Sequence, residues 1–207
     1  MIAIIDYKAG NLTSVKRALD YLNIESIITA DFNSIVNANR VIFPGVGHAG
    51  TAMEVMKKRK LDIALWRVFE KGTPILGICL GSQIILSDSE EGDTECLGLI
   101  KGTSLKFKLK NPNLKIPHMG WNEVRKTQEH FILKDLKPKE ELYFVHSYYP
   151  QPVDDKAVFA ISDYEVDFPV VIGYKNLIAT QFHLEKSGPI GLKMLRNFTE
   201  WDGTNVK

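Results

Sequence analysis

The chain has 207 residues, of which 44% are hydrophobic and 25% charged, as is typical of a globular protein with a buried core. Its 26 basic and 25 acidic residues leave a formal net charge of +1. Nucleic-acid-binding domains usually carry a clear basic excess, so we expect no nucleic-acid partner.

No apolar run approaches the roughly 20 residues that cross a bilayer, so we expect no membrane segment. Residue 1 leads directly into a strand-like run without a charged leader, so we also expect no signal peptide. Two cysteines in dissimilar contexts, Cys79 and Cys96, do not suggest a disulfide framework. These features favour a reducing, cytoplasmic location.

The first half of the chain alternates between strand and helix patterns. Residues 2–5 are a short apolar run, as expected of a strand buried on both faces of a parallel sheet. Residues 11–22 carry apolar side chains at the 3.6-residue period of a helix with one buried stripe. The alternation continues with strands at 26–29, 40–43 and 73–78 and helices at 32–38 and 53–69, the last broken near Lys60. Such alternation predicts a parallel α/β sheet.

The second half changes character. It contains short strand-like runs with few helices between them, at 98–102, 104–109, 120–124, 142–145, 157–162, 170–174 and 177–181. These runs predict antiparallel strands in a mixed sheet or in a smaller second sheet. A final helix is predicted to begin at Ser187 or Gly188, with Pro189 in its first turn, and to reach about Trp201. We find no repeat or linker that divides the chain, which predicts one domain over residues 1–207.

One cysteine lies where a nucleophile elbow is expected. The segment Gly77-Ile78-Cys79-Leu80-Gly81 follows an apolar strand and precedes a helix-compatible run. In a nucleophile elbow, the central residue lies on a strained strand-to-helix turn, and the flanking glycines permit close backbone approach. The start of the following helix favours the thiolate. A buried structural cysteine is the plain alternative, and Cys96, which lacks this context, fits that alternative better.

A catalytic cysteine requires a histidine that accepts and returns a proton, and usually a group that orients the histidine. His183 closes an apolar strand and has Glu185 two residues further on, which could hydrogen-bond one ring nitrogen. His146 lies at the end of another predicted strand. Spacing alone favours His183 and leaves His146 open.

Acyl transfer also requires backbone N–H groups that stabilise an oxyanion. Pro44-Gly45-Val46-Gly47 suits this role because glycines permit unusual backbone conformations, and the Leu80 N–H is a second candidate donor. Read singly, Pro44-Gly45-Val46-Gly47 fits an ordinary turn better. No zinc-finger spacing or glycine-rich phosphate loop is present, so we expect neither a metal nor a cofactor.

Taken together, these segments resemble the class I glutamine amidotransferases, and specifically the glutaminase subunits of imidazole glycerol phosphate synthase. The resemblance runs from end to end. It is carried by Asp6-Tyr7, Gly10-Asn11-Leu12, Pro44-Gly45-Val46-Gly47, Gly77-Ile78-Cys79-Leu80-Gly81, Gln83, Pro117-His118-Met119-Gly120-Trp121-Asn122, Tyr143-Phe144-Val145-His146-Ser147-Tyr148-Tyr149 and Thr180-Gln181-Phe182-His183. It implies a doubly wound, mostly parallel α/β sheet with additional antiparallel strands.

The resemblance also implies roles for individual residues. Cys79 would be the nucleophile, His183 the acid and base, and Glu185 its orienting carboxylate. The implied oxyanion donors are Val46, Gly47 and Leu80; the implied glutamine-binding residues are Gly45, Gln83, Ser147 and Tyr148; and the residues implied to lie near a partner are Asn11, Tyr143 and Lys186. The implied partner is a (βα)8-barrel cyclase that receives ammonia for histidine biosynthesis, with glutaminase activity low until the partner binds.

Three residues depart from the usual family pattern. Ser82 replaces a methionine, Leu184 replaces a proline, and Lys8 replaces a glycine. None removes a catalytic group, although Leu184 lacks the backbone constraint of proline. Two alternatives therefore stay open: a paralogous glutaminase that supplies another synthase, such as one that aminates a sugar, and a catalytically silent binding subunit.

Overall fold

The computed structural model describes residues 1–8 and 10–204, which are organised around an eight-stranded sheet. In spatial order the strands are β2 (Ser26–Thr29), β1 (Ile2–Ile5), β3 (Arg40–Gly45), β4 (Ile75–Cys79), β14 (Leu177–Thr180), β13 (Asp167–Tyr174), β12 (Val158–Asp163) and β9 (Arg125–Lys126). The first five are parallel, and β13, β12 and β9 continue the sheet in antiparallel pairings. The predicted fold class, a mostly parallel sheet with added antiparallel strands, is therefore confirmed.

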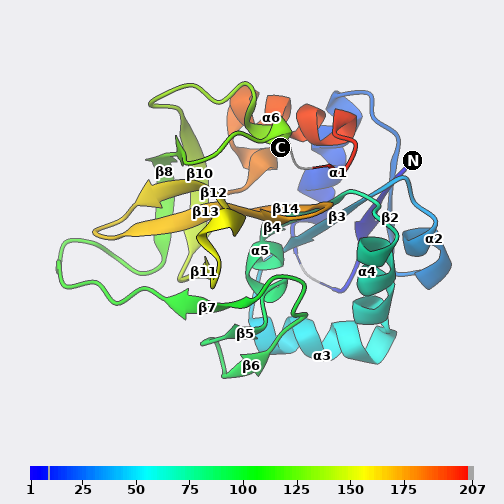
Figure 1. The fold of residues 1–207 in the computed structure, drawn as a ribbon, viewed down its shortest axis with the longest axis horizontal. Coiled ribbons are helices and arrows are strands. Elements are labelled where there is room, and N and C mark those ends of the chain that lie inside the picture. Colours follow the sequence, from blue (N-terminus) through cyan, green and yellow to red (C-terminus); the bar gives the residue numbers. More distant parts are fainter. Residues whose placement is uncertain (9, 205–207) are drawn as a thin grey trace.

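Helices cover both faces of this sheet (Figure 1). On one face lie α1 (Leu12–Tyr21) and α6 (Gly188–Glu200), and on the other lie α2 (Phe32–Val36), α3 (Ala49–Arg59), α4 (Leu61–Glu70) and α5 (Leu80–Ile84). Each face buries its own apolar cluster, because the parallel strands are apolar on both sides. No helix among the described residues is both long and apolar enough to cross a membrane.

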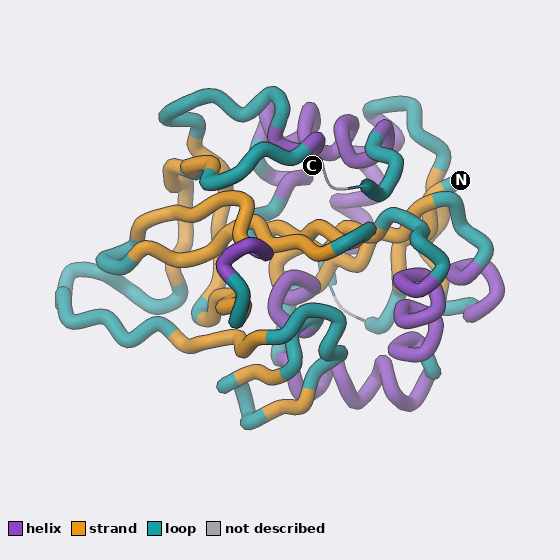
Figure 2. The backbone as a smooth tube through the Cα atoms, viewed as in Figure 1, coloured by secondary structure: helices purple, strands orange, loops and turns teal. Residues whose placement is uncertain are grey.

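Two smaller sheets flank the large one, and Figure 2 shows them with the loop of residues 107–117 extending away at the left. One sheet pairs β8 (His118–Glu123) with β10 (Glu141–His146). The other has the order β11 (Tyr148–Pro152), β7 (Gly102–Lys106), β5 (Asp88–Ser89) and β6 (Thr94–Glu95). Among the described residues there are also three short 3-10 helices: η1 (Phe131–Leu133), η2 (Asp155–Ala157) and η3 (Leu184–Lys186).

The sequence-based elements agree with the structure in most places. The predicted break near Lys60 is confirmed, because Lys60 has φ 58° and separates α3 from α4. The last helix begins after Ser187 with proline in its first turn, as predicted. The predicted strand at 98–102 is wrong. Ile100 is buried there, but its N–H bonds to the Ile85 carbonyl just after α5, so the apolar run packs against that turn.

The parallel strands place their carboxyl ends along one edge of the large sheet. β3 ends at Gly45, β4 ends at Cys79, and β14 ends at Thr180, three residues before His183. Ligands of open α/β sheets bind beyond this edge. The fold thus brings three separate segments of the sequence to one place.

Candidate active site

Cys79 occupies a strained turn between β4 and α5. Its backbone has φ 53° and ψ −107°, an unusual conformation for a residue with a side chain. A Cβ atom at Gly81 would lie 2.0 Å from the Phe43 carbonyl oxygen, and one at Gly77 would lie 2.9 Å from the Ala179 Cβ. The flanking glycines are therefore required by packing, and the turn has the form predicted for a nucleophile elbow.

The structure brings His183 and Glu185 together as a buried pair. His183 Nδ1 lies 2.8 Å from Glu185 Oε1, and the two side chains are 1% and 0% exposed. The Asn11 side-chain amide donates to the same carboxylate oxygen. Asn11 Nδ2 also lies 3.3 Å from His183 Nδ1. Because Nδ1 donates its own proton to Glu185, the Asn11 amide serves the carboxylate and not the ring.

Cys79 influences the charge of His183. Burial lowers the pKa of His183, but the interactions with Cys79 and Glu185 together raise it by more, to about 10. The His183 Nε2 atom is buried and has no hydrogen-bond partner among the described residues. The contribution of Cys79 to this pKa includes both hydrogen bonding and charge, so the ring lies close to the Cys79 sulfur even though no His183–Cys79 hydrogen bond of standard geometry is formed. The structure therefore places a charged imidazolium next to the sulfur that is predicted to be the nucleophile.

His146, the alternative base, is committed to a structural network. Its Nδ1 donates to the Tyr148 carbonyl oxygen at 2.8 Å, and its Nε2 lies 3.0 Å from His118 Nδ1. Asn122 Nδ2 in turn lies 3.3 Å from His118 Nε2. Burial lowers the pKa of His146 to about 3 and that of His118 to about 4, so both rings stay neutral. This geometry favours His183 as the base.

A pocket of about 260 Å³ opens beside Cys79. It is lined by Val46, Gly47, Cys79, Leu80, Gln83, Glu91, Pro117, Val145, His146, Ser147 and Tyr148. All three expected oxyanion residues and three of the four expected glutamine-binding residues are among them. The fourth, Gly45, is buried below the pocket, where an added Cβ would lie 1.7 Å from the Tyr7 hydroxyl oxygen.

The predicted substrate-binding residue Gln83 also organises the pocket wall. Its Nε2 donates to the Tyr148 carbonyl oxygen at 2.8 Å and to Gln181 Oε1 at 3.0 Å. Sequence reasoning assigned no role to Gln181, or to Glu91, whose Oε2 accepts from the Ala49 N–H at 2.7 Å. Glu91 lies in an ordinary charged stretch, and no local pattern distinguishes it from its neighbours.

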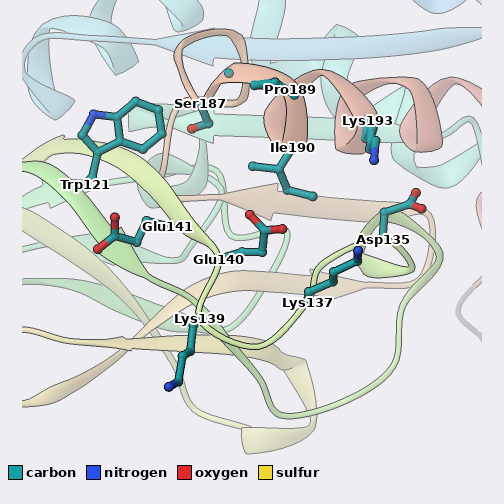
Figure 3. Close-up of a pocket in the computed structure, with 11 residues that line it drawn as sticks. Trp121, Asp135, Lys137, Lys139, Glu140, Glu141, Ser187, Pro189, Ile190 and Lys193 are labelled. Atoms are coloured by element: carbon teal, nitrogen blue, oxygen red, sulfur yellow. The ribbon is translucent and has the colours of Figure 1, made fainter.

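A second pocket, of about 470 Å³, lies beside the start of α6 and contains none of these groups. Figure 3 shows that its wall includes Trp121, Ser187 and Ile190, with lysines and carboxylates around them. None of its lining residues is a cysteine or histidine, so its wall offers no cysteine–histidine pair. The described residues also contain no group of three metal-ligating side chains.

The expected partner residues Tyr143 and Lys186 lie close together near His183. Lys186 Nζ lies 5.9 Å from the centre of the Tyr143 ring, and Trp121 packs edge-on against that ring at 5.9 Å. The third, Asn11, instead directs its side chain to the His183–Glu185 pair. A backbone hydrogen bond connects Tyr143 directly to His183, because the His183 N–H donates to the Tyr143 carbonyl oxygen at 2.9 Å.

Comparisons with known proteins point to the family that the sequence resembles. A family model described as Glutamine amidotransferase class-I matches residues 3–201. The chain is 48% identical to the "Imidazole glycerol phosphate synthase subunit HisH" of Nitratidesulfovibrio vulgaris strain DP4, with 96% of this chain and 95% of that protein aligned. It is 43% identical to "Imidazole glycerol phosphate synthase subunit HisH 1" of Methanococcus maripaludis, with 97% and 99% aligned.

Solved structures share the fold at low sequence identity. One described as "Crystal structure of glutamine amidotransferase" has a TM-score of 0.75 and 16% identity, over 99% of this chain and 100% of that one. "Structure of PurLQS from Thermotoga maritima" has a TM-score of 0.74 and 19% identity, over 96% and 97%. The chain belongs to the class I glutamine amidotransferase family, and within that family it groups with the HisH subunits.

Proposed function

We propose that this chain is the glutaminase subunit of an imidazole glycerol phosphate synthase. It hydrolyses glutamine to glutamate and ammonia, and it delivers the ammonia to a (βα)8-barrel cyclase that makes imidazole glycerol phosphate and AICAR in histidine biosynthesis. The observation that carries the proposal is a strained cysteine at the mouth of a pocket, electrostatically coupled to a buried His–Glu pair. The similarity to HisH subunits supports this pathway over a sugar-aminating paralogue.

The mechanism is acyl transfer through a thioester. The Cys79 thiolate attacks the side-chain amide carbon of glutamine, and N–H groups of Val46, Gly47 and Leu80 stabilise the oxyanion that forms. His183 donates its proton to the amide nitrogen as the carbon–nitrogen bond breaks, which releases ammonia. His183 then takes a proton from water, and the resulting hydroxide hydrolyses the thioester and releases glutamate.

Glu185 and Asn11 keep the imidazole oriented during these steps. The Glu185 carboxylate accepts the Nδ1 proton at 2.8 Å, so the catalytic proton resides on Nε2. That atom is buried and has no hydrogen-bond partner among the residues that the structure describes, which suits a proton that is transferred. A protonated His183 at neutral pH supplies the acid for the first half-reaction.

The pocket suits the polar end of glutamine. Glutamine carries an α-ammonium group, and Glu91 is the one carboxylate among the residues that line the pocket. An ammonium bound at Glu91 would direct the side-chain amide toward Cys79. The Ser147–Tyr148 backbone and Gln83 complete the wall, in agreement with the roles that the family resemblance implies.

An exposed apolar surface supports the proposal that a barrel partner binds this chain. Met119 and Trp121 on β8 are 62% and 53% exposed, and Tyr143 on the paired strand β10 lies opposite Trp121. Large exposed apolar side chains gathered in one place are typical of protein interfaces. We call Met119, Trp121, Tyr143 and Lys186 the docking patch. Its backbone bond to His183 offers a path by which partner binding adjusts the catalytic histidine.

The proposal includes one domain over residues 1–207 and a cytoplasmic location. Cys79 and Cys96 are both free thiols, which fits a reducing compartment.

The test is glutamate release from glutamine, measured with and without the purified barrel cyclase. We expect the cyclase to stimulate the wild type, and Cys79→Ala to lose at least about a thousandfold of the stimulated rate. A wild-type rate no higher than that of Cys79→Ala would contradict the enzyme assignment and leave a silent binding subunit. An active glutaminase whose complex fails to convert the histidine-pathway ribonucleotide would instead favour the paralogue.

A further inference from the structure

The side chain of Gln181 contacts Cys79 and Gln83, two residues that line the pocket. Gln181 follows β14 and is fully buried. Its backbone N–H donates to the Val170 carbonyl oxygen at 2.8 Å, which holds the chain in place. Its side-chain Nε2 lies 3.7 Å from Cys79 Sγ, the atom proposed to attack the substrate.

Neighbouring donors determine which end of the Gln181 amide faces the sulfur. Gln83 Nε2 lies 3.0 Å from Gln181 Oε1, and the Ser82 hydroxyl lies 3.5 Å from the same oxygen. Gln83 Nε2 in turn donates to the Tyr148 carbonyl oxygen. If the Gln181 amide were flipped, its NH2 group would face the NH2 group of Gln83, which is a repulsive contact. The oxygen therefore faces Gln83, and the NH2 group faces Cys79.

We propose that Gln181 is a further catalytic residue, whose side-chain amide donates a hydrogen bond to the Cys79 thiolate and links that sulfur to the glutamine pocket. This inference rests on the proposed role of Cys79 as nucleophile. A hydrogen bond from a donor to a charged acceptor is stronger than one between neutral groups. The Gln181 amide consequently stabilises the thiolate more than the thiol.

The same contacts connect substrate binding to the nucleophile. Tyr148 lines the pocket, its carbonyl oxygen holds Gln83, and Gln83 holds the Gln181 oxygen. The Gln181 amide accepts from Gln83 at its oxygen and donates to Cys79 from its nitrogen, so polarisation of Gln181 by Gln83 strengthens the contact with the sulfur. A glutamine bound against Tyr148 and Gln83 therefore acts on the amide that contacts the sulfur.

Ser82, one of the departures from the usual family pattern, also belongs to this network. Its hydroxyl is buried and donates to the Cys79 carbonyl oxygen at 2.7 Å. The hydroxyl has one proton, so the long contact with Gln181 Oε1 is weaker than the one from Gln83. The orientation of Gln181 therefore depends mainly on Gln83.

The test is the rate at which iodoacetamide alkylates Cys79, measured against pH without glutamine or partner, in a Cys96→Ala background. Burial raises the pKa of Cys96 to about 12, with smaller effects from nearby charges, so Cys96 is alkylated slowly at neutral pH. The Cys96→Ala substitution ensures that all alkylation, including that at high pH, occurs at Cys79. Gln181→Met keeps a similar volume but has no donor, and Gln181→Glu keeps the shape but places negative charge beside the sulfur. Thermal melting shows whether each variant is folded.

We expect Gln181→Met to slow alkylation at neutral pH about tenfold and to shift the profile about one pH unit upward, and Gln181→Glu to slow it further. A folded Gln181→Met variant with the wild-type profile would overturn the proposal. Should neither variant fold, NMR of the wild type decides. The Gln181 side-chain amide protons are then expected to shift over the pH range in which Cys79 ionises, and their failure to shift would overturn the proposal.

These outcomes separate this inference from the proposed function. If the wild type with its cyclase releases no more glutamate than Cys79→Ala, the proposed function fails, whatever the alkylation profile. If the wild type is active and Gln181→Met is alkylated normally, only the role of Gln181 fails.

Discussion

His183 and Glu185 form a buried pair in which Nδ1 of the ring lies 2.8 Å from Oε1 of the carboxylate. Both side chains are removed from solvent, so neither charge is screened by water or salt. This ion pair exists only in the folded protein, where His183 and Glu185 are brought together. The protonation of His183 is therefore linked to the free energy of unfolding.

The first prediction concerns the pH dependence of stability. The pKa of His183 is raised from 6.5 to about 10 in the folded protein, so the folded state binds this proton more tightly than the unfolded state. The stabilisation is fully present below about pH 6.5 and is lost as pH rises toward about 10, by at most about 1.4 kcal/mol per pH unit. Urea unfolding at several pH values across this window measures it.

Cysteine, tyrosine and lysine side chains also titrate in the upper part of this window, so a control is needed. His183→Asn removes the ring, and we expect a shallower decline in its free energy of unfolding over the same range. An equally steep decline in that variant would assign the effect to other groups.

The second prediction concerns Asn11. Its amide donates to Glu185, and its backbone has φ 76°, a left-handed conformation that asparagine and glycine tolerate. Asn11→Gly keeps the backbone and loses the donor, whereas Asn11→Asp places a second carboxylate against Glu185. We expect kcat of the cyclase complex to fall about tenfold in the first variant and further in the second, with KM little changed.

A binding measurement with the cyclase separates the two roles of Asn11. Weaker binding with an unchanged kcat would make Asn11 a partner contact only, as the family resemblance implies, and would contradict its role in orienting the catalytic pair.

The third prediction concerns Gly45 and Tyr7. A Cβ at Gly45 would lie 1.7 Å from the Tyr7 hydroxyl oxygen, which is itself buried and has no hydrogen-bond partner in the described part of the chain. Gly45→Ala is expected to cost about 1–3 kcal/mol through overpacking. Tyr7→Phe is expected to be neutral or stabilising, because it removes an unsatisfied buried hydroxyl.

The double variant tests the contact itself. With the hydroxyl gone, the new methyl group would lie 3.0 Å from the ring carbon that carried it, so the clash is reduced but not abolished. We expect denaturant unfolding to show a coupling of about 1 kcal/mol or more in favour of the double variant. Purely additive effects would contradict this packing.

The fourth prediction concerns Lys186, an exposed cation over the Tyr143 ring. Lys186→Ala is expected to reduce stimulation of glutaminase activity by the cyclase several-fold, with the rate in the absence of the cyclase similar to wild type. Lys175 is a matched control, since its Nζ lies 5.3 Å from the Tyr174 ring at the opposite end of β14. Lys175→Ala should be stimulated normally. Equal stimulation of both variants would remove Lys186 from the docking patch.

Local sequence patterns were enough to predict the features that depend on neighbouring residues. The elbow at Cys79, the helix break at Lys60 and the start of the last helix after Ser187 were all predicted, because glycine, proline and apolar periodicity act locally. The error at residues 98–102 has the same origin. An apolar run can pack beneath a helix as well as pair in a sheet, and the run itself does not distinguish the two.

Contacts between groups that are distant in the sequence became known from the folded structure. Asn11 contacts Glu185 across 174 positions and Gln181 contacts Cys79 across 102, separations over which no pattern in one sequence specifies a contact. The two candidate histidines differ for the same reason, since His146 is bonded to His118 and Tyr148 while His183 is paired with Glu185. The parallel sheet brings His183 and Cys79 to the same place, because it aligns the carboxyl ends of β3, β4 and β14 along one edge.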